Sequence, residues 1–581
     1  MRTKAHFVDT FRPPLAPELF ETYSFFELYP FDGGGCFINH EIVGAVDDRE
    51  YTLNITEKDA LAEFGGFEQT DFLKFEHWRT IERSCWINRM YFIVPMAAWA
   101  KKSGNEKLAR KVFDVMLRFG RSLEYAPPET QEETVRLHRE VLRRRDEEYN
   151  ALGPEFDAPV PYQWFDFQPA SRIIHMIHAL YFLREFDIFS DEEWAEAEEL
   201  VFIHGRNIYW GEAGGLPLTP DNHQALRGLA LMLACAFFRG ERGTAAWIPA
   251  AERICNYHIL NDFLPDGMLI DLSPSYHFFE CWITRDVLLL ADREHYNITP
   301  EARERAAKAF GICRALRQPD GLSPVISDGY PLDMAIFVRS LGEMAGPGAE
   351  ELFLPDAGMA VKARPDGDLL LFDCAPLLES LSHYHGGKQA PTLFLKGRCF
   401  LADSGCCSYD DADFSKYFKQ SFAHSTLLID GKGDSVLQGL YTWLEAPKCR
   451  LSDWQGNTVS SEMVSRAPGW EGVRWRRTLD FEPGSLKIHD SVTAPREKEF
   501  AFVFVLHHEV EVFWDETGTR VRLANGGVKA EAEFPFPVEL LPGTGFADFR
   551  KVPAKRLVMR RRCSGGDFTV TFRVADTCPQ R

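Results

Sequence analysis

The chain has 581 residues, of which 45% are hydrophobic and 26% charged, and its formal net charge at pH 7 is −21. This length indicates two or more domains, each able to bury a core of its own. The acidic balance argues against nucleic acid as a partner, because phosphate binding needs a basic surface. A polyanionic ligand would need a locally basic groove within an acidic protein.

The cysteines and the N-terminus bear on the compartment. The 13 cysteines are scattered, and Cys406 and Cys407 are adjacent, which favours reduced thiols. No apolar segment follows the basic N-terminus, and no stretch approaches the roughly 18 apolar residues of a membrane span. We therefore expect no membrane segment and a cytoplasmic protein. Removal of an upstream export signal would instead place it in the periplasm or outside the cell. A homo-oligomer is left open.

Helical periodicity runs from about residue 70 to about residue 345. Leu108, Val112 and Phe119 recur at helix spacing, and Ser190 with Glu193 is typical of a capping box. A second apolar stripe comprises Leu226, Leu229, Ala230, Leu233 and Phe237. Many helices of similar length in series predict an incomplete (α/α) toroid or a solenoid.

After about residue 355 the apolar period changes to two. The expected strands include Leu369–Phe372, Leu393–Phe400, Thr426–Ile429 and Phe502–Leu506. Turn signals at 430–433 and 525–527 separate such runs. This pattern predicts an antiparallel β-sandwich that extends to the end of the chain.

The change of period divides the chain into three predicted parts. We expect an N-terminal extension at 1–50 that packs on the rest, a toroid at 51–348 and a β-sandwich domain at 349–581. The fold class is therefore multidomain α + β, with the incomplete (α/α) toroid preceding the antiparallel β-sandwich.

Two segments of the helical part carry candidate functional groups. Asn222 and His223 follow Asp221 directly before an apolar helix, either as part of a helix cap or on a functional loop at the mouth of the helical domain. Tyr276 and His277 follow a Ser-Pro-Ser stretch and open a helix. Tyr276 is either a packed ring with its hydroxyl satisfied or a functional group.

Histidines and one aspartate stand out in the β part. His383 and His385 are two residues apart, so on a strand their imidazoles would point to the same face. Gly386 and Gly387 beside them permit close approach of a ligand or backbone. Two imidazoles on one face favour a site over core filling.

A metal site is a second interpretation of the same region. Asp403 follows the expected strand Leu393–Phe400, and His424 precedes the strand Thr426–Ile429. Together with His385 they offer a set of nitrogen and oxygen ligands that suits Zn²⁺ or Mn²⁺.

Taken in chain order, these segments resemble the heparinase II/III-like polysaccharide lyases, a family that includes glycosaminoglycan and alginate lyases. The shared pattern is Asn-His, then Asp-Gly with Ser-Pro-x-Tyr-His, then His-x-His, Asp-x-Gly and Ala-His-(Asn/Ser)-Thr, across about residues 220–430. The resemblance implies a helical toroid followed by a β-domain. It also implies cleavage of a uronic-acid polymer by β-elimination, with an anionic polysaccharide as the partner.

The resemblance assigns roles position by position. Asn222 resembles the family residue that neutralises the uronate carboxylate, and His223 resembles its neighbour in the active site. Tyr276 and His383 resemble the catalytic pair. We expect His383 as base and Tyr276 as acid for one uronate epimer, and Tyr276 in both roles for the other.

The same resemblance implies a metal centre. His385, Asp403 and His424 resemble the family's ligands for one divalent ion, zinc or manganese. We expect a structural ion that ties down the strand presenting His383.

Three further residues are candidate substrate contacts. Tyr409 and Tyr417 are alternatives for a second tyrosine that some relatives use. Arg172 resembles a residue on a helix that lines the groove, where it could contact a carboxylate or sulfate, or form a structural pair with an aspartate. The family's Asp is missing after His385, and Ser425 replaces its Asn, which leaves the substrate subclass open.

The expected substrate is a glycosaminoglycan such as heparan sulfate, hyaluronan or chondroitin sulfate, with alginate as the alternative. A glycoside hydrolase would need paired carboxylates, for which Asp221, Asp266 and Asp271 are available. A glycan-binding protein without catalytic activity is the third alternative.

Overall fold

The computed structural model of the protein forms two compact units. The first comprises Met1–Phe263, Phe279–Ala306 and Ile336–Gly342, and the second comprises Leu264–Phe278, Ala307–Ala335 and Glu343–Arg581. The residues that the structure describes are 89–90, 93–121, 126–144, 162–165, 167–329, 331, 334, 338, 341–376, 383–407, 411–439, 442–547 and 550–575. The expected N-terminal extension at 1–50 lies outside them.

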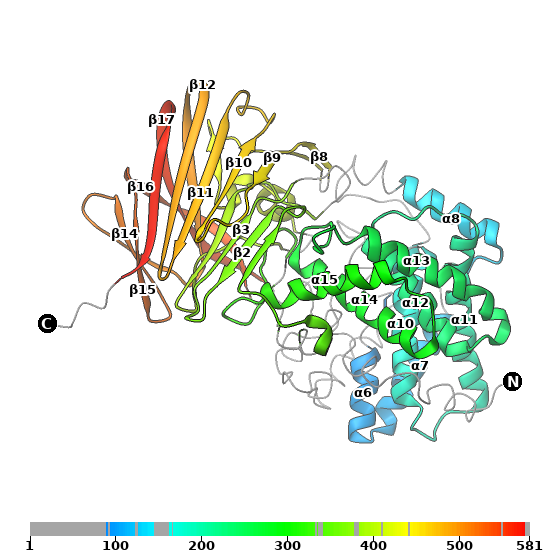
Figure 1. Ribbon diagram of the computed structural model, residues 1–581. Helices are drawn as coiled ribbons and strands as arrows, with labels where there is room; N and C mark the ends of the chain where they lie inside the picture. The colour runs from blue at the N-terminus through cyan, green and yellow to red at the C-terminus, as the bar shows by residue number, and fades with distance from the viewer. Residues whose placement is uncertain are drawn as a thin grey trace. The chain divides into compact units, whose positions relative to one another are not determined.

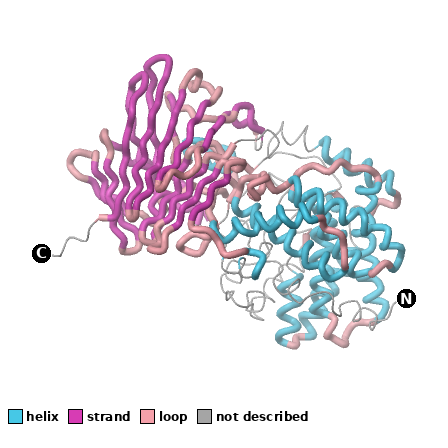
Figure 2. The backbone as a smooth tube through the Cα atoms, viewed as in Figure 1, coloured by secondary structure: helices cyan, strands magenta, loops and turns pink. Residues whose placement is uncertain are grey.

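Among the described residues before β1, the regular elements are helices, joined by loops and turns (Figure 1, Figure 2). The α-helices are α6 (Ile93–Ser103), α7 (Glu106–Arg121), α8 (Gln131–Arg144), α10 (Phe167–Leu183), α11 (Asp191–Ala213), α12 (Asn222–Phe238), α13 (Ile248–Asn261), α14 (Pro274–Glu294) and α15 (Pro300–Ala315). Shorter helical turns are η2 (Tyr162–Trp164), η3 (Glu241–Trp247) and η4 (Gly342–Ala345). Both α14 and α15 contribute residues to the two units.

Helices α10 and α12 form the centre of the first unit. Every residue of α10 is buried, and α10 packs against α6, α11 and α12. The apolar stripe expected at Leu226–Phe237 is buried as predicted, but burial extends around nearly the whole circumference of α12. A helix surrounded by other helices must be apolar on all sides, so a one-sided stripe understates its burial.

Local capping chemistry fixes where two of these helices begin. Ser190 caps α11, accepting from the Glu193 backbone N–H while the Glu193 side chain accepts from the Ser190 backbone N–H, as the predicted capping box requires. Asp221 caps α12, and its Oδ1 accepts from the His223 backbone N–H at 2.9 Å. The helix-cap interpretation of the Asp221 segment is therefore confirmed.

The second unit is dominated by antiparallel strands. They are β1 (Glu351–Leu354), β2 (Met359–Ala363), β3 (Leu369–Asp373), β4 (Ala390–Leu395), β5 (Arg398–Leu401), β6 (Leu427–Ile429), β7 (Val436–Gln438), β8 (Thr442–Glu445), β9 (Lys448–Leu451), β10 (Thr458–Val464), β11 (Arg474–Glu482), β12 (Ser485–Leu506), β13 (Glu511–Trp514), β14 (Arg520–Asn525), β15 (Val528–Glu533), β16 (Val538–Ala547) and β17 (Arg550–Val574). A π-helical turn, η5 (Phe414–Phe418), and the 3-10 turn η6 (Ser421–Ala423) interrupt them.

Two long strands organise the sheet. Strands β12 and β17 pair from Ser485↔Arg573 to Leu506↔Lys555, with an irregularity between Thr493 and Lys498. The main path runs β1-β2-β3-β4-β5-β12-β17-β15-β14-β13, and β6, β11 and β16 pair with the long strands beside it. Strands β7 and β8 form a separate two-stranded sheet.

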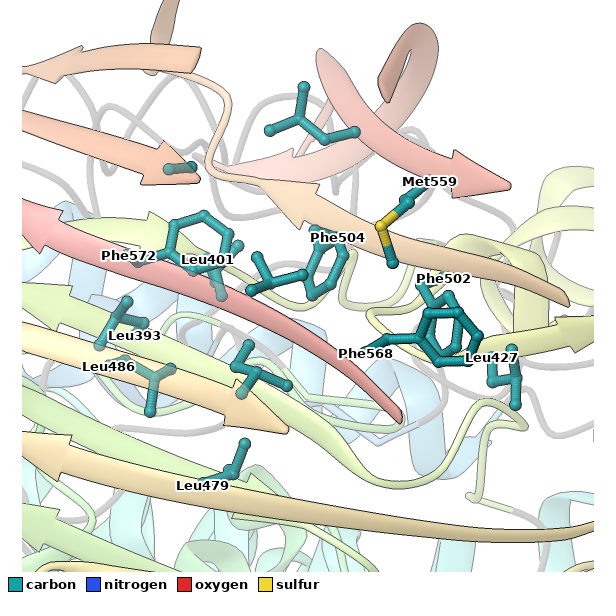
Figure 3. Close-up of a cluster of buried hydrophobic side chains, with 14 of the residues drawn as sticks. Leu393, Leu401, Leu427, Leu479, Leu486, Phe502, Phe504, Met559, Phe568 and Phe572 are labelled. Carbon is teal, nitrogen blue, oxygen red and sulfur yellow. The ribbon is translucent and has the colours of Figure 1, made fainter. Parts of the chain in front are cut away.

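The end of β12 is buried on both faces, and Figure 3 shows the face that carries Phe502 and Phe504. Phe502 and Phe504 belong to the large core, where their rings lie 5.0 Å from Phe568 and 5.8 Å from Phe572. The intervening Ala501, Val503 and Val505 pack in a smaller cluster with Leu428 and Val558. Since strand side chains alternate between faces, an uninterrupted apolar run here fills two clusters at once.

One expected strand is wrong. The run Leu393–Phe400 is a hairpin: β4 ends at Leu395 and β5 begins at Arg398. Lys396 and Gly397 both have positive φ, 50° and 77°, which reverses the chain in a tight turn. Both halves are apolar and buried, and the Lys396-Gly397 pair between them marks the turn.

The predicted fold class is confirmed, with helices first and an antiparallel β-sandwich second. The expected boundary at 348 falls between η4 and β1, yet the segments Leu264–Phe278 and Ala307–Ala335 belong to the second unit. The cysteines among the described residues are free thiols. None of the described helices is both long and apolar enough to cross a bilayer.

Candidate active site and metal centre

A tyrosine and a histidine ring are stacked in the second unit. Tyr276 lies in the first turn of α14, and its ring centroid is 3.8 Å from that of His383 with 20° between the planes. The turn before the helix is tight: Leu272 has φ 54° and donates to the Leu269 carbonyl at 2.9 Å. The expected opening of a helix at the Tyr-His pair is confirmed, and the fold brings Tyr276 and His383 together.

An aspartate faces the stacked histidine. The Asp271 Oδ2 lies 3.2 Å from His383 Nδ1, an ion-pair distance whose alignment falls outside that of a regular hydrogen bond. Burial alone would lower the pKa of the His383 imidazole, but the carboxylates of Asp271 and Asp328 together outweigh burial and raise that pKa above its ordinary value. With Nδ1 turned to the carboxylate, Nε2 is the nitrogen left for proton transfer.

The segment that carries His383 and His385 is a loop ahead of β4, so the expectation of a strand is wrong. The Gly387 and Lys388 backbone N–H groups donate to the two carboxylate oxygens of Asp434 at 2.9 and 2.8 Å. Tyr384 is fully buried, and its hydroxyl donates to the Ile270 carbonyl at 2.8 Å. Side-chain and backbone hydrogen bonds, rather than a sheet ladder, hold this loop.

His385 is held by a buried carboxylate. The His385 Nε2 lies 2.7 Å from Asp328 Oδ1, and both side chains are almost fully buried. His385 Nδ1 has no hydrogen-bond partner. A buried nitrogen without a partner is costly unless another ligand binds it.

His385, Asp403 and His424 offer ligand atoms that all lie within 4.8 Å of one another. His424 Nε2 lies 2.8 Å from the Phe418 carbonyl, and His424 Nδ1 lies 2.8 Å from Asp403 Oδ2. An imidazole that donates from Nε2 to the carbonyl turns the Nδ1 lone pair toward the carboxylate. Two acceptors that close need a positive charge between them, which either a second proton on His424 or a metal ion supplies, and His385 Nδ1 is a third acceptor without a hydrogen-bond partner. The residues therefore fit a divalent metal ion.

Gly387 packs directly against one member of this set. It has φ +80°, and a Cβ placed on it would lie 2.7 Å from His424 Cβ. Gly431 has a similar φ of +74° but open space around it. Gly387→Ala is expected to lose metal affinity as well as stability. Gly431→Ala is expected to lose only the roughly 1–2 kcal/mol of a left-handed alanine. Metal content after dialysis and urea unfolding separate the two, and equal metal content in both variants would contradict a ligand role for His424.

Asn222 and His223 belong to the first unit and begin α12, so the alternative of a loop is wrong. The Asn222 side chain is 7% exposed, and the His223 ring packs edge-on against Phe167 at 4.9 Å. Their position depends on the cap that Asp221 supplies.

Removal of that cap gives a stability prediction. Asp221→Ala is expected to lower the free energy of unfolding by about 1 kcal/mol, because a backbone N–H at the helix start loses its acceptor. Urea unfolding followed by far-UV circular dichroism measures the change. Ser190→Ala, which removes the cap of α11, is the matched variant and is expected to lose a similar amount. An Asp221→Ala protein as stable as the parent would show that water replaces the cap at no cost.

The expected substrate contacts have other partners in the structure. Arg172 is fully buried, with its Nε donating to His204 Nε2 at 2.8 Å and its Nη2 donating to the Gln163 carbonyl. This interior position does not support a substrate contact. The Tyr417 hydroxyl accepts from the Thr544 backbone N–H of β16 at 2.8 Å. Tyr409 lies outside the described residues.

Sequence reasoning missed Asp328 and gave Asp271 a different role, as a carboxylate for a hydrolase. Asp328 lies 57 positions before His385 in the chain, and Asp271 lies still further before His383. No local pattern joins such pairs. The only signal for Asp271 was its place five residues before Tyr276 in the same conspicuous segment.

Solved structures share this fold. Heparinase III matches with a TM-score of 0.66 and 16% identity, over 99% of this chain and 94% of that one. A mutant heparan sulfate lyase from Pedobacter heparinus matches with a TM-score of 0.60 and 14% identity, over 98% and 85%. At these identities the likeness establishes the fold. No curated protein matches the sequence.

The helical region and the antiparallel sheet domain, with the family matches that follow, are those of a polysaccharide lyase. The family description "Heparinase II/III N-terminus" matches residues 217–347, and "Heparinase II/III-like, C-terminal" matches residues 346–571. The chain belongs to the heparinase II/III-like family, as the ordered motifs predicted.

Proposed function

We propose that the protein cleaves a uronic-acid-containing glycosaminoglycan by β-elimination. The observation that carries this proposal is the Tyr276–His383 stack at 3.8 Å, with Asp271 at the Nδ1 of the histidine. Stacked rings of this kind can present a phenol hydroxyl and an imidazole nitrogen to the same sugar linkage. A glycoside hydrolase would need two free carboxylates flanking the bond, whereas Asp221 caps a helix and Asp271 faces a histidine.

The chemistry needs a base, an acid and a stabilised carboxylate. His383 Nε2 removes the C5 proton, the electron pair forms the C4–C5 double bond, and the C4–O bond breaks as Tyr276 protonates the leaving oxygen. Asn222 and His223, by their resemblance to the family residues, neutralise the uronate carboxylate as charge develops on it. For the opposite epimer at C5, Tyr276 takes both proton-transfer roles.

A divalent ion, zinc or manganese, belongs to this proposal as a structural cofactor. His385 Nδ1, His424 Nδ1 and the Asp403 carboxylate would hold it, and its charge would neutralise acceptors that otherwise face one another. His385 is two residues from His383, so a fixed His385 also restricts where the His383 imidazole can lie.

The glycosaminoglycan class is supported by the family and by the likeness to structures named as heparinase III and heparan sulfate lyase. Alginate is the alternative, because the Asp expected after His385 is a glycine here and Ser425 stands where the family has Asn.

A panel of polymers tests the proposal. The protein is incubated with heparan sulfate, hyaluronan, chondroitin sulfate and alginate, and near-UV absorbance follows the unsaturated uronate that only elimination forms. We expect absorbance with at least one glycosaminoglycan. Absorbance with alginate alone would support the alternative, and new reducing ends without absorbance would show hydrolysis. Binding without a change in polymer length would show a glycan-binding protein.

A further inference from the structure

Two carboxylates face the two imidazoles of the loop His383–Gly387, one each. We propose that Asp271 and Asp328 are positioning residues with separate tasks. Asp271 holds His383 for proton transfer, and Asp328 holds His385 for metal binding. This inference rests on the proposed function for Asp271 and on the proposed metal for Asp328.

Asp271 is well placed to fix the orientation of His383. It is 6% exposed and lies five residues before Tyr276, so one short segment supplies both neighbours of the imidazole. The Tyr384 hydroxyl donates to the carbonyl of Ile270, so the segments of Asp271 and His383 are joined at a second point. A carboxylate at Nδ1 keeps the proton on that nitrogen and leaves the Nε2 lone pair for the substrate.

Asp328 makes three connections within the site. Its Oδ1 lies 2.7 Å from His385 Nε2, and its backbone N–H donates to the His383 carbonyl at 3.0 Å. The backbone carbonyl of Asp328 accepts from the hydroxyl of Ser273 at 3.3 Å, and Ser273 lies three residues before Tyr276 in the chain. A carboxylate that accepts from one ring nitrogen makes the other a better metal ligand, and the other nitrogen of His385 is the one without a partner.

A buried carboxylate needs compensation, and the structure supplies it. Asp328 is 0% exposed, which would be costly for an isolated charge. Lys419, also 0% exposed, attracts it electrostatically. The Lys419 carbonyl accepts from the Gly386 N–H at 3.0 Å, so this cation belongs to the same loop arrangement. Lys419 thus offsets part of the cost of burying the Asp328 carboxylate.

Asp271→Asn and Asp328→Asn test the two tasks in the full-length protein. For Asp271→Asn we expect kcat on the best polymer to fall by about 10²–10⁴-fold, with KM within about twofold and with parental metal content. The kcat of Asp271→Glu, which keeps the carboxylate, is expected to lie between the kcat of the parent and that of Asp271→Asn.

For Asp328→Asn we expect the Zn²⁺ affinity to fall by about 10–100-fold. Competition with a chromophoric chelator measures it.

Asp320→Asn is the matched control, because Asp320 is in the same segment as Asp328 and accepts only from the Leu322 N–H among the hydrogen bonds described. We expect it to bind Zn²⁺ and turn over substrate like the parent. Near-parental kcat in Asp271→Asn would contradict the proposal that Asp271 positions His383. Parental Zn²⁺ affinity in Asp328→Asn would contradict the proposal that Asp328 positions His385. If an Asn variant does not fold by circular dichroism, the Glu variant at that position is measured instead, and parental kcat in Asp271→Glu or parental Zn²⁺ affinity in Asp328→Glu overturns the role proposed for that aspartate. If the parent forms no unsaturated product from any polymer, the proposed function fails together with the Asp271 task, while Zn²⁺ affinity still decides the Asp328 task.

Discussion

Tyr276→Phe is expected to lower kcat by about 10²–10⁴-fold while the protein stays folded, because general acid–base catalysis contributes that much. The phenyl ring can keep the stack on His383, whose centroid lies 3.8 Å from that of Tyr276. Only the hydroxyl that protonates the leaving oxygen is lost. Initial rates from near-UV absorbance on the best polymer measure the effect, and KM is expected to change little.

Tyr209→Phe is the matched control. Tyr209 stacks on Trp247 at 5.8 Å in the first unit, so the same atom is removed from a ring whose described contact is apolar. We expect parental turnover from this variant. Near-normal turnover from Tyr276→Phe would remove Tyr276 from proton transfer altogether.

Removal of the metal by chelation is the second large effect that we expect. The free energy of unfolding should fall by about 4 kcal/mol relative to protein saturated at 1,000 times Kd, because a ligand bound only to the folded state stabilises it by that amount. Without the ion, His385 Nδ1 is left buried without a partner. Turnover should fall as well, since His383 shares the loop. Thermal unfolding and near-UV rates, before and after chelation, measure both effects.

Readdition of Zn²⁺ or Mn²⁺ identifies the ion that restores stability and turnover. His424→Ala should behave like the chelated protein and respond to neither ion. His489→Ala is the control, because His489 lies on the exposed side of β12 and its Nδ1 is 3.0 Å from Thr569 Oγ1. Complete removal of metal with no change in stability or rate is incompatible with a structural ion.

The fold was predictable where the signal is local. The capping box at Ser190 and Glu193 and the turn at Asn525-Gly526-Gly527 are short-range features, and both occur where expected. The hairpin within Leu393–Phe400 was missed, although the polar Lys396-Gly397-Arg398 stretch divides the two apolar halves and Gly397 is a local turn signal. The extent of burial around α12 also depends on its neighbours.

The candidate site was predictable only where a motif stays within a few residues. Tyr276 and His383 were found by motif order, and the structure stacks them. Asp328 was not predicted, because no local sequence pattern distinguishes this aspartate from others in a loop. Its importance arises from contacts with His385 and Ser273, which are remote in the chain.

The segments Leu264–Phe278 and Ala307–Ala335 fold with the sheet, although they precede it in the chain. This has a consequence for dissecting the protein. A cut at residue 348 would leave Tyr276 and Asp271 on one fragment and His383 on the other. Neither fragment would then contain both members of the proton-transfer pair. The second unit therefore cannot be expressed as one continuous segment of the chain. We expect activity from the two fragments only when they are mixed and reassociate.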